Sequence, residues 1–213
     1  MRNFILPILT LWVLFIPVSS FAQNADIQLS KPDISSGKPL MTALNERSSQ
    51  REFSDRELTP EQISGLLWAA CGINRPETGK RTAPSAMNWQ DVQVYVFLKT
   101  GIYLYKEVEH KLALIKEGDY RAAAGSQDFV ASAPVNLVYV SDYSRMTKAK
   151  DSDKEFYSGI NSGFISQNVY LYCASEGLNT VVRAYIDRDA LHKLLELKPE
   201  QHAVVAQTIG CKP

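Results

Sequence analysis

The sequence predicts one domain that combines helices with a single β-sheet, of the α/β or the mixed α+β class. Two patterns alternate along the chain. Residues 91–98 (DVQVYVFL) carry valine or leucine at every second position, which is typical of a strand. Residues 58–73 instead carry apolar residues at i, i+3, i+4 and i+7, the spacing of a helix with one buried face. A chain of 213 residues can bury one sizeable core, and no repeat divides it.

The 58–73 segment also carries signals for both ends of a helix. Thr59 can cap the first turn, Pro60 suits the first helical position, and Gln62 completes a capping box. Gly72 is a typical residue just after a helix. This segment is therefore the clearest helix in the sequence.

The remaining elements follow from the same patterns. Residues 73–90 are rich in Pro, Gly and polar residues and predict a long loop, and long loops on compact domains are often functional. Further helices are expected at about 41–48, 107–117, 119–131, 153–177 and 187–197, and further strands at 102–105, 134–142, 180–186 and 202–210.

The expected helix at 153–177 is long and apolar on more than one face. Phe156, Ile160 and Phe164 add to the apolar residues on its other side. A helix that is apolar nearly all round needs cover on all sides. We therefore expect a second subunit to close one side of it.

The N-terminus resembles an export signal. A basic Arg2 precedes an apolar run at 4–18, and Ser20 and Ala22 are the small residues that signal peptidase needs before Gln23. The alternative is a membrane anchor, but the run is shorter than the roughly 20 residues of a spanning helix. We predict a cleaved signal peptide at 1–22, a periplasmic protein, an extended arm at 23–40 and a single domain at 41–213. No stable membrane insertion is expected.

Composition and motifs argue against several classes of function. Lys plus Arg equals Asp plus Glu at 23 each, so no global charge draws the chain to nucleic acid. The three cysteines and three histidines form no metal-binding spacing, and no hydrolase or P-loop motif is present. Cys71 and Cys173 lie in apolar contexts typical of buried free thiols, although a disulfide stays possible. The histidines are expected at the surface, and no side chain is predicted to be an acid/base catalyst.

A short basic segment, NERSSQREF at 45–53, is the first candidate site. On a continued helix, Arg47 and Arg51 would lie one turn apart and repel each other weakly. A phosphate between them would remove that penalty and accept hydrogen bonds from the hydroxyls of Ser48 and Ser49. The alternative is a basic turn that faces water. A second polar region, with Pro84, Ser85 and Asn88, offers groups to a ligand.

The order of several motifs resembles the nitroreductase-like flavoprotein superfamily, in particular the branch that includes the azoline dehydrogenases of peptide maturation. The family's opening Arg-x-Ser-x-Arg-x-Phe is matched by Arg47, Ser49, Arg51 and Phe53. The matches that follow are the Pro-Ser loop ending at Asn88, GIYLY, SAPVNLVYV, SQNVYLYCASEGLNTVV and the terminal TIGCKP. They run in order over about 165 residues. No single motif is specific, but the order and spacing of the set are.

The resemblance implies an α+β fold, with a central, mainly antiparallel sheet flanked by helices, and a homodimer built around a long central helix. It also implies FMN at the dimer interface. Arg47, Ser48, Ser49 and Arg51 would hold its phosphate, and Lys212 would replace a basic residue that many relatives carry beyond the terminal motif. The ring would be reached by Pro84, Ser85, Ala86, Met87 and Asn88 of the partner and lined by backbone near Arg183, Ala184 and Tyr185. Ser126 and Gln127 are further candidates for its ribityl or pyrimidine side.

These expectations lead to an exported FMN-dependent oxidoreductase. It would transfer hydride through flavin N5 between a small-molecule donor and acceptor in a ping-pong reaction. The alternative is a flavin- or ligand-binding protein of the same fold without turnover. For Arg183 we consider two orientations, one toward the flavin or substrate and one toward solvent.

Overall fold

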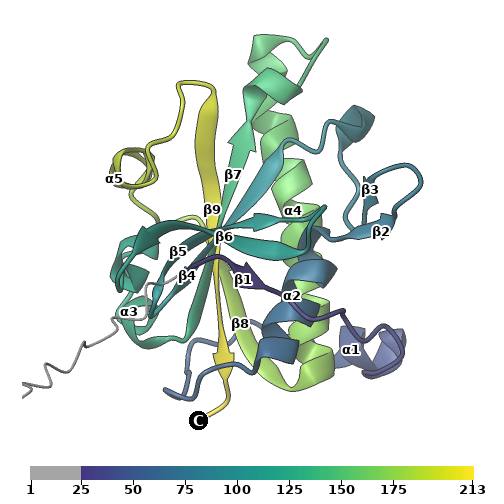
Figure 1. The fold of residues 1–213 in the computed structure, drawn as a ribbon, viewed down its shortest axis with the longest axis vertical. Helices are drawn as coiled ribbons and strands as arrows, with labels where there is room; N and C mark the ends of the chain where they lie inside the picture. Colours follow the sequence, from purple (N-terminus) through teal and green to yellow (C-terminus); the bar gives the residue numbers. More distant parts are fainter. Residues whose placement is uncertain (1–24) are drawn as a thin grey trace, which may run out of the picture.

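A seven-stranded antiparallel sheet forms the centre of the computed structural model, which describes residues 25–213 (Figure 1). The strands run in the order β1-β6-β5-β4-β7-β9-β8, and every neighbouring pair is antiparallel. Their bounds are β1 Ile27–Gln28, β4 Val92–Leu98, β5 Gly101–Lys106, β6 Lys111–Glu117, β7 Val135–Asp142, β8 Leu178–Arg183 and β9 Gln201–Cys211. The α+β class with a mainly antiparallel sheet is thus confirmed. The predicted signal peptide lies outside the described residues.

Helices cover both faces of the sheet (Figure 1). One face carries α1 (Leu40–Glu46), α2 (Pro60–Cys71) and the long α4 (Asp151–Glu176). The other carries α5 (Arg188–Leu194), the short α3 (Phe129–Ser132) and a 3-10 turn, η2 (Arg121–Ala124). Each face therefore has its own apolar core, one under α2 and α4 and one under α3 and α5.

The two main helices begin and end where the sequence indicates. Thr59 caps α2, and its side chain and that of Gln62 complete the capping box. Gly177 follows α4 with φ of +70°, a left-handed conformation that glycine adopts without a steric penalty. Because α4 spans 26 residues, it runs past several strands and can position groups at both of its ends.

The two helices predicted at 107–117 and 119–131 are wrong. Residues 111–117 form β6, which pairs with β5 on one side and with β1 on the other. Leu112 is fully buried in the core beneath this sheet. Lys and Glu in KLALIKE favour a helix locally, but pairing with β5 decides the structure. In the second segment, Gly125 and Ser126 separate η2 from α3.

The arm and the long loop also contain more structure than expected. Within the arm, β1 adds an edge strand to the sheet, and Leu29 is buried. The 73–90 segment contains a hairpin of β2 (Ile73–Arg75) and β3 (Lys80–Arg81) and a 3-10 turn, η1 (Ala86–Asn88). A further 3-10 turn, η3 (Tyr143–Arg145), follows β7.

The cysteines are buried and His110 is half-buried. Cys71, Cys173 and Cys211 are buried and free, as predicted for the first two, and burial raises the pKa of Cys71 to about 12. His110 is less exposed than the surface position predicted for it, because Nδ1 contacts the Tyr105 hydroxyl and Nε2 contacts Ser64 Oγ, each at 2.8 Å. Within residues 25–213, no helix is long and apolar enough to cross a membrane, and no cluster of acidic, His or Cys side chains could hold a metal ion.

We expect His110 to make stability depend on pH. Burial lowers the pKa of His110 from its ordinary value of 6.5, so the folded state favours the neutral ring. Between the folded and the ordinary pKa, the unfolded chain binds more protons, and stability falls as the pH drops below about 6.5. Urea unfolding of wild type and His110→Gln at pH 7.5 and 5.5 tests this, since the wild-type advantage should shrink at the lower pH. An equal advantage at both pH values would show that the ring does not titrate in this way.

Candidate functional site

Residues 47–51, here called the phosphate segment, form neither a helix nor a strand. Helix α1 ends at Glu46, and Arg47 leaves the helix with φ of −55° and ψ of 122°. Arg47 and Arg51 are therefore not one helical turn apart, and the geometric premise taken from the sequence is wrong.

Contacts with α4 and β8 fix the phosphate segment. The Ser49 hydroxyl lies 2.8 Å from the Tyr170 hydroxyl, and the Arg47 guanidinium lies over the Tyr170 ring at 5.3 Å. The Gln50 amide donates to the Thr180 carbonyl at 3.0 Å, and the Val182 amide donates to the Tyr170 hydroxyl at 2.9 Å. Tyr170 therefore links the segment to α4 and β8, a role that no sequence pattern indicates.

A polar cavity of about 300 Å³ lies beside this segment. Glu46, Ser48 and Gln50 line it from one end of the chain and Lys212 from the other, and Glu46 is paired with Lys38. Arg47 and Arg51 belong to the same segment but do not line the cavity. Within residues 25–213, neither Arg47, Arg51 nor Lys212 forms a salt bridge. Cations without a carboxylate partner are groups that bind a phosphate. The residues present therefore fit the phosphate of a nucleotide-like cofactor.

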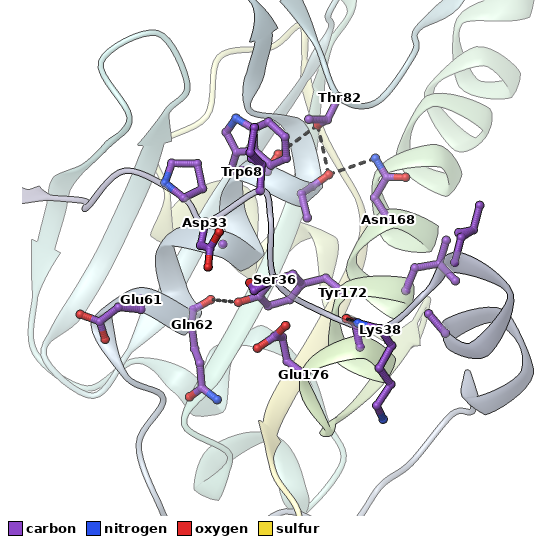
Figure 2. Close-up of a pocket in the computed structure, with 18 of the residues that line it drawn as sticks. Asp33, Ser36, Lys38, Glu61, Gln62, Trp68, Thr82, Asn168, Tyr172 and Glu176 are labelled. Atoms are coloured by element: carbon purple, nitrogen blue, oxygen red, sulfur yellow. Dashed lines mark hydrogen bonds between the residues drawn. The ribbon is translucent and has the colours of Figure 1, made fainter.

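A larger cavity, of about 650 Å³, lies between the arm, α2 and α4 (Figure 2). None of the residues predicted for a site lines it. The polar groups around it bond within the protein, as when the Tyr172 hydroxyl donates to the Gln62 carbonyl at 3.1 Å. Lys38 is paired with Glu46, and the carboxylates of Asp33, Glu61 and Glu176 line the same walls as Lys31 and Lys38. Size alone therefore does not make it the better candidate for an anionic cofactor.

The predicted ring-side residues Pro84, Ser85, Ala86, Met87 and Asn88 lie elsewhere on the same chain. Met87 is 76% exposed, and Pro84 and Asn88 are exposed as well. The Ala86 amide contacts Asn161, whereas the phosphate segment contacts Tyr170. Nine residues of helix between those two contacts amount to about 14 Å along α4. One chain therefore does not bring the two groups together.

Arg183 lies at the end of β8, with its side chain inside the protein. It is 5% exposed, and its guanidinium donates to Asn136 Oδ1 at 3.0 Å, Thr208 Oγ1 at 2.9 Å and the Ala124 carbonyl at 2.8 Å. Burial lowers its pKa to about 10. The solvent-facing orientation is therefore wrong. Ala184 and Tyr185 follow on the surface, and the Ala184 carbonyl accepts from the Ile186 amide at 3.0 Å.

Gln127 belongs to the surroundings of Arg183 rather than to the phosphate segment. A Cβ at Gly125 would lie 1.9 Å from Arg183 Nη1 and 3.1 Å from Gln127 Oε1, so both groups crowd that glycine. Within the described part of the chain, Gln127 Oε1 is buried and has no hydrogen-bond partner. Ser126 is exposed beside it. An unpaired buried acceptor is unusual and can serve a ligand donor.

Comparison with known proteins identifies the family. The Nitroreductase family model matches residues 44–211. The chain belongs to the nitroreductase family. A nitroreductase relative from Methanocaldococcus jannaschii is 30% identical over 197 residues, which cover 87% of this chain and 97% of the relative.

Solved structures agree with this assignment. A crystal structure of a nitroreductase relative from Ralstonia eutropha JMP134 has a TM-score of 0.85 and 42% identity, and the match covers 89% of this chain and 90% of that one. The NADPH:FMN oxidoreductase of Vibrio harveyi, solved with NAD+, has a TM-score of 0.61 over 81% of this chain and 68% of that one. At 20% identity, the second comparison supports the fold alone.

Proposed function

We propose that this nitroreductase-family oxidoreductase depends on FMN and passes electrons from one small molecule to another in a ping-pong reaction. The observation that carries the proposal is the polar cavity lined by Ser48 and Lys212, next to a segment whose two arginines form no salt bridge within the described residues. Bound FMN would supply hydride transfer through N5, and the protein would supply binding, orientation and exclusion of water. Because the flavin would carry the hydride, no side chain needs to act as an acid/base catalyst, which agrees with a sequence without such a motif.

The residues proposed to hold the cofactor fall into two groups. The phosphate would be held by Arg47, Ser48, Ser49, Arg51 and Lys212. The ring would be contacted by the exposed backbone of Ala184 and Tyr185 after Arg183, by Gln127, and by residues 84–88 of a second copy. The separation of the phosphate segment from the 84–88 loop within one chain supports a site completed by that second copy.

We also propose that the second copy packs on α4. Phe156 is 66% exposed, Phe164 is 42% exposed, and Ile160 lies between them on the same side of the helix. Met87 adds a large exposed apolar side chain near the start of this surface. Contiguous exposed apolar surface of this kind commonly marks a protein interface. A homodimer would cover it and bring the 84–88 loop to the partner's phosphate segment.

The alternative is a flavin- or ligand-binding protein of the same fold without turnover. It is favoured by the same absence of an acid/base motif in the sequence. Export through the signal at 1–22 to the periplasm and membership of the azoline-dehydrogenase branch stay predictions from sequence alone. Export would deprive the protein of abundant nicotinamide, so its natural donor would be a different small molecule.

The test uses the purified mature protein under anaerobic conditions. If the protein is an enzyme, it binds FMN, and the bound flavin loses its absorbance near 450 nm when NAD(P)H or a chemical donor is added. The absorbance returns when an acceptor such as a quinone or a nitroaromatic is added. A protein that holds FMN but transfers no electrons to any acceptor would support the binding-protein alternative. A protein without FMN affinity would contradict both the proposed enzyme and a flavin-binding role.

A further inference from the structure

The loop at 84–90 is held in an unusual backbone conformation. Met87, Asn88 and Gln90 have φ values of 50°, 54° and 50°, in the left-handed region that residues other than glycine rarely adopt. Three such residues within four positions carry a conformational cost. They persist only where surrounding contacts determine the backbone, and such strain is frequently found at ligand sites.

Contacts from outside η1 hold this loop. The Gln90 amide donates to Ser85 Oγ at 2.9 Å, which closes the loop on itself. Arg145 Nη1 donates to the Gln90 carbonyl at 2.9 Å. On the α4 side, the Ala86 amide donates to Asn161 Oδ1 at 3.0 Å. The Asn161 bond therefore attaches the exposed tip of the loop to the long helix.

The orientation of Asn161 is set by a buried carboxylate. Asn161 Nδ2 donates to Asp91 Oδ1 at 2.6 Å, and Ser141 Oγ donates to Asp91 Oδ2 at 2.7 Å. Asp91 and Ser141 are 0% exposed and Asn161 is 1% exposed. Because Asn161 directs its NH₂ toward Asp91, its Oδ1 is left to accept from the Ala86 amide. Within residues 25–213, Asp91 forms no salt bridge, so neutral donors alone satisfy it.

We infer that Asp91 and Asn161 are positioning residues that hold the 84–88 backbone in the shape required over the ring of a bound flavin. The inference rests on the proposed function for the identity of the ligand. Asp91 acts through Asn161, and Asn161 acts through the Ala86 amide. Neither side chain reaches the surface, so neither contacts the substrate.

Exchanging the carboxylate and the amide between positions 91 and 161 distinguishes a positioning role from a general loss of stability. In Asn161→Asp, two carboxylates face each other and the link to the loop is weakened. In Asp91→Asn, the new amide can offer its oxygen to Asn161 and its NH₂ to Ser141 Oγ, so the effect should be small. The double variant Asp91→Asn/Asn161→Asp restores both bonds with the carboxylate and amide exchanged. Asn168→Asp is the control, because Asn168 also lies on α4 but donates to the Ala69 carbonyl at 3.0 Å, away from the loop.

The first readout needs no cofactor. Hydrogen exchange of the peptide containing residues 84–90 is measured in the apo protein by mass spectrometry. We expect exchange at least tenfold faster in Asn161→Asp, near wild-type exchange in Asp91→Asn and in the double variant, and unchanged exchange of this peptide in Asn168→Asp. Loss of the fold would accelerate exchange throughout the chain, so the other peptides detect it.

The second readout tests the link to the site. With FMN bound, Asn161→Asp should shift the visible flavin spectrum and lower kcat/KM for the acceptor at least tenfold, and the double variant should regain both. If wild type binds no FMN, the proposed function fails while the exchange data still test the positioning of the loop. If FMN binds and Asn161→Asp matches wild type in exchange, spectrum and kcat/KM, the inference is overturned. Failure of the double variant to recover any of the three would also overturn it.

Discussion

Arg51→Ala is expected to weaken FMN binding by about 1.5–3 kcal/mol, or roughly ten- to a hundredfold, the range for one hydrogen bond to a charged group. Its cation is exposed and forms no salt bridge within residues 25–213, so its removal leaves no buried partner unsatisfied. The double variant Arg47→Ala/Arg51→Ala should lose about 3–6 kcal/mol if the two contributions add. Fluorescence titration of the apo protein with FMN measures both.

Arg56→Ala is the matched control for this titration. Arg56 is an exposed arginine five residues further along the chain and is not among the residues predicted to bind the cofactor. Its loss removes the same charge and should leave FMN affinity within about twofold. Equal affinities for wild type, Arg51→Ala and the double variant would show that the phosphate binds elsewhere. Equal losses in Arg51→Ala and Arg56→Ala would indicate a general charge effect.

Gly163→Arg is expected to convert the proposed homodimer into a folded monomer. In one chain, a Cβ at Gly159 or Gly163 would meet nothing within 4 Å, so a side chain there is tolerated. Both glycines lie on α4 beside Ile160 and Phe164, on the surface proposed for the second copy. A buried, unpaired charge at that position should weaken association by about 3–5 kcal/mol. The helix itself should gain stability, because glycine is a poor helix former by about 1 kcal/mol.

Light scattering at micromolar concentration measures this change, and circular dichroism reports whether the fold is kept. Ala190→Arg is the control, because Ala190 is a small exposed residue on α5, on the opposite face of the sheet. It should stay dimeric. A dimer that survives Gly163→Arg unchanged would exclude α4 as the interface. A wild-type protein that is monomeric with FMN bound would exclude a site shared between copies.

Local patterns were enough to predict much of the fold. Strands β4, β7 and β9 are long and buried, and their apolar residues follow the period of the sheet. Helix α4 could be predicted from its apolar length and from Gly177 at its end. β6 could not, because KLALIKE suits a helix as well as a strand, and only pairing with β5 decides between them.

The sequence indicates which residues belong to the site but not how they are arranged in space. The motif order indicates Arg47, Ser49 and Arg51, but the position of their segment depends on contacts with residues far along the chain, such as Thr180. The buried position of Arg183 depends in the same way on acceptors from two other strands, Asn136 and Thr208. No local pattern expresses such long-range contacts.

The support for the 84–90 loop was missed for the same reason. Asp91 and Asn161 are 70 residues apart in sequence, and each is an ordinary residue in its local context. The one feature that points to this support is Asn161 itself, because asparagine is seldom buried on the sheet side of a long helix.

The flavin content of the purified mature protein tests the central proposal most directly. After gel filtration, the protein is denatured, and the released flavin is identified and measured against the protein concentration. The account predicts about one FMN per subunit, released without covalent attachment, in a fraction that elutes as a dimer. A colourless protein that also fails to take up added FMN would contradict it.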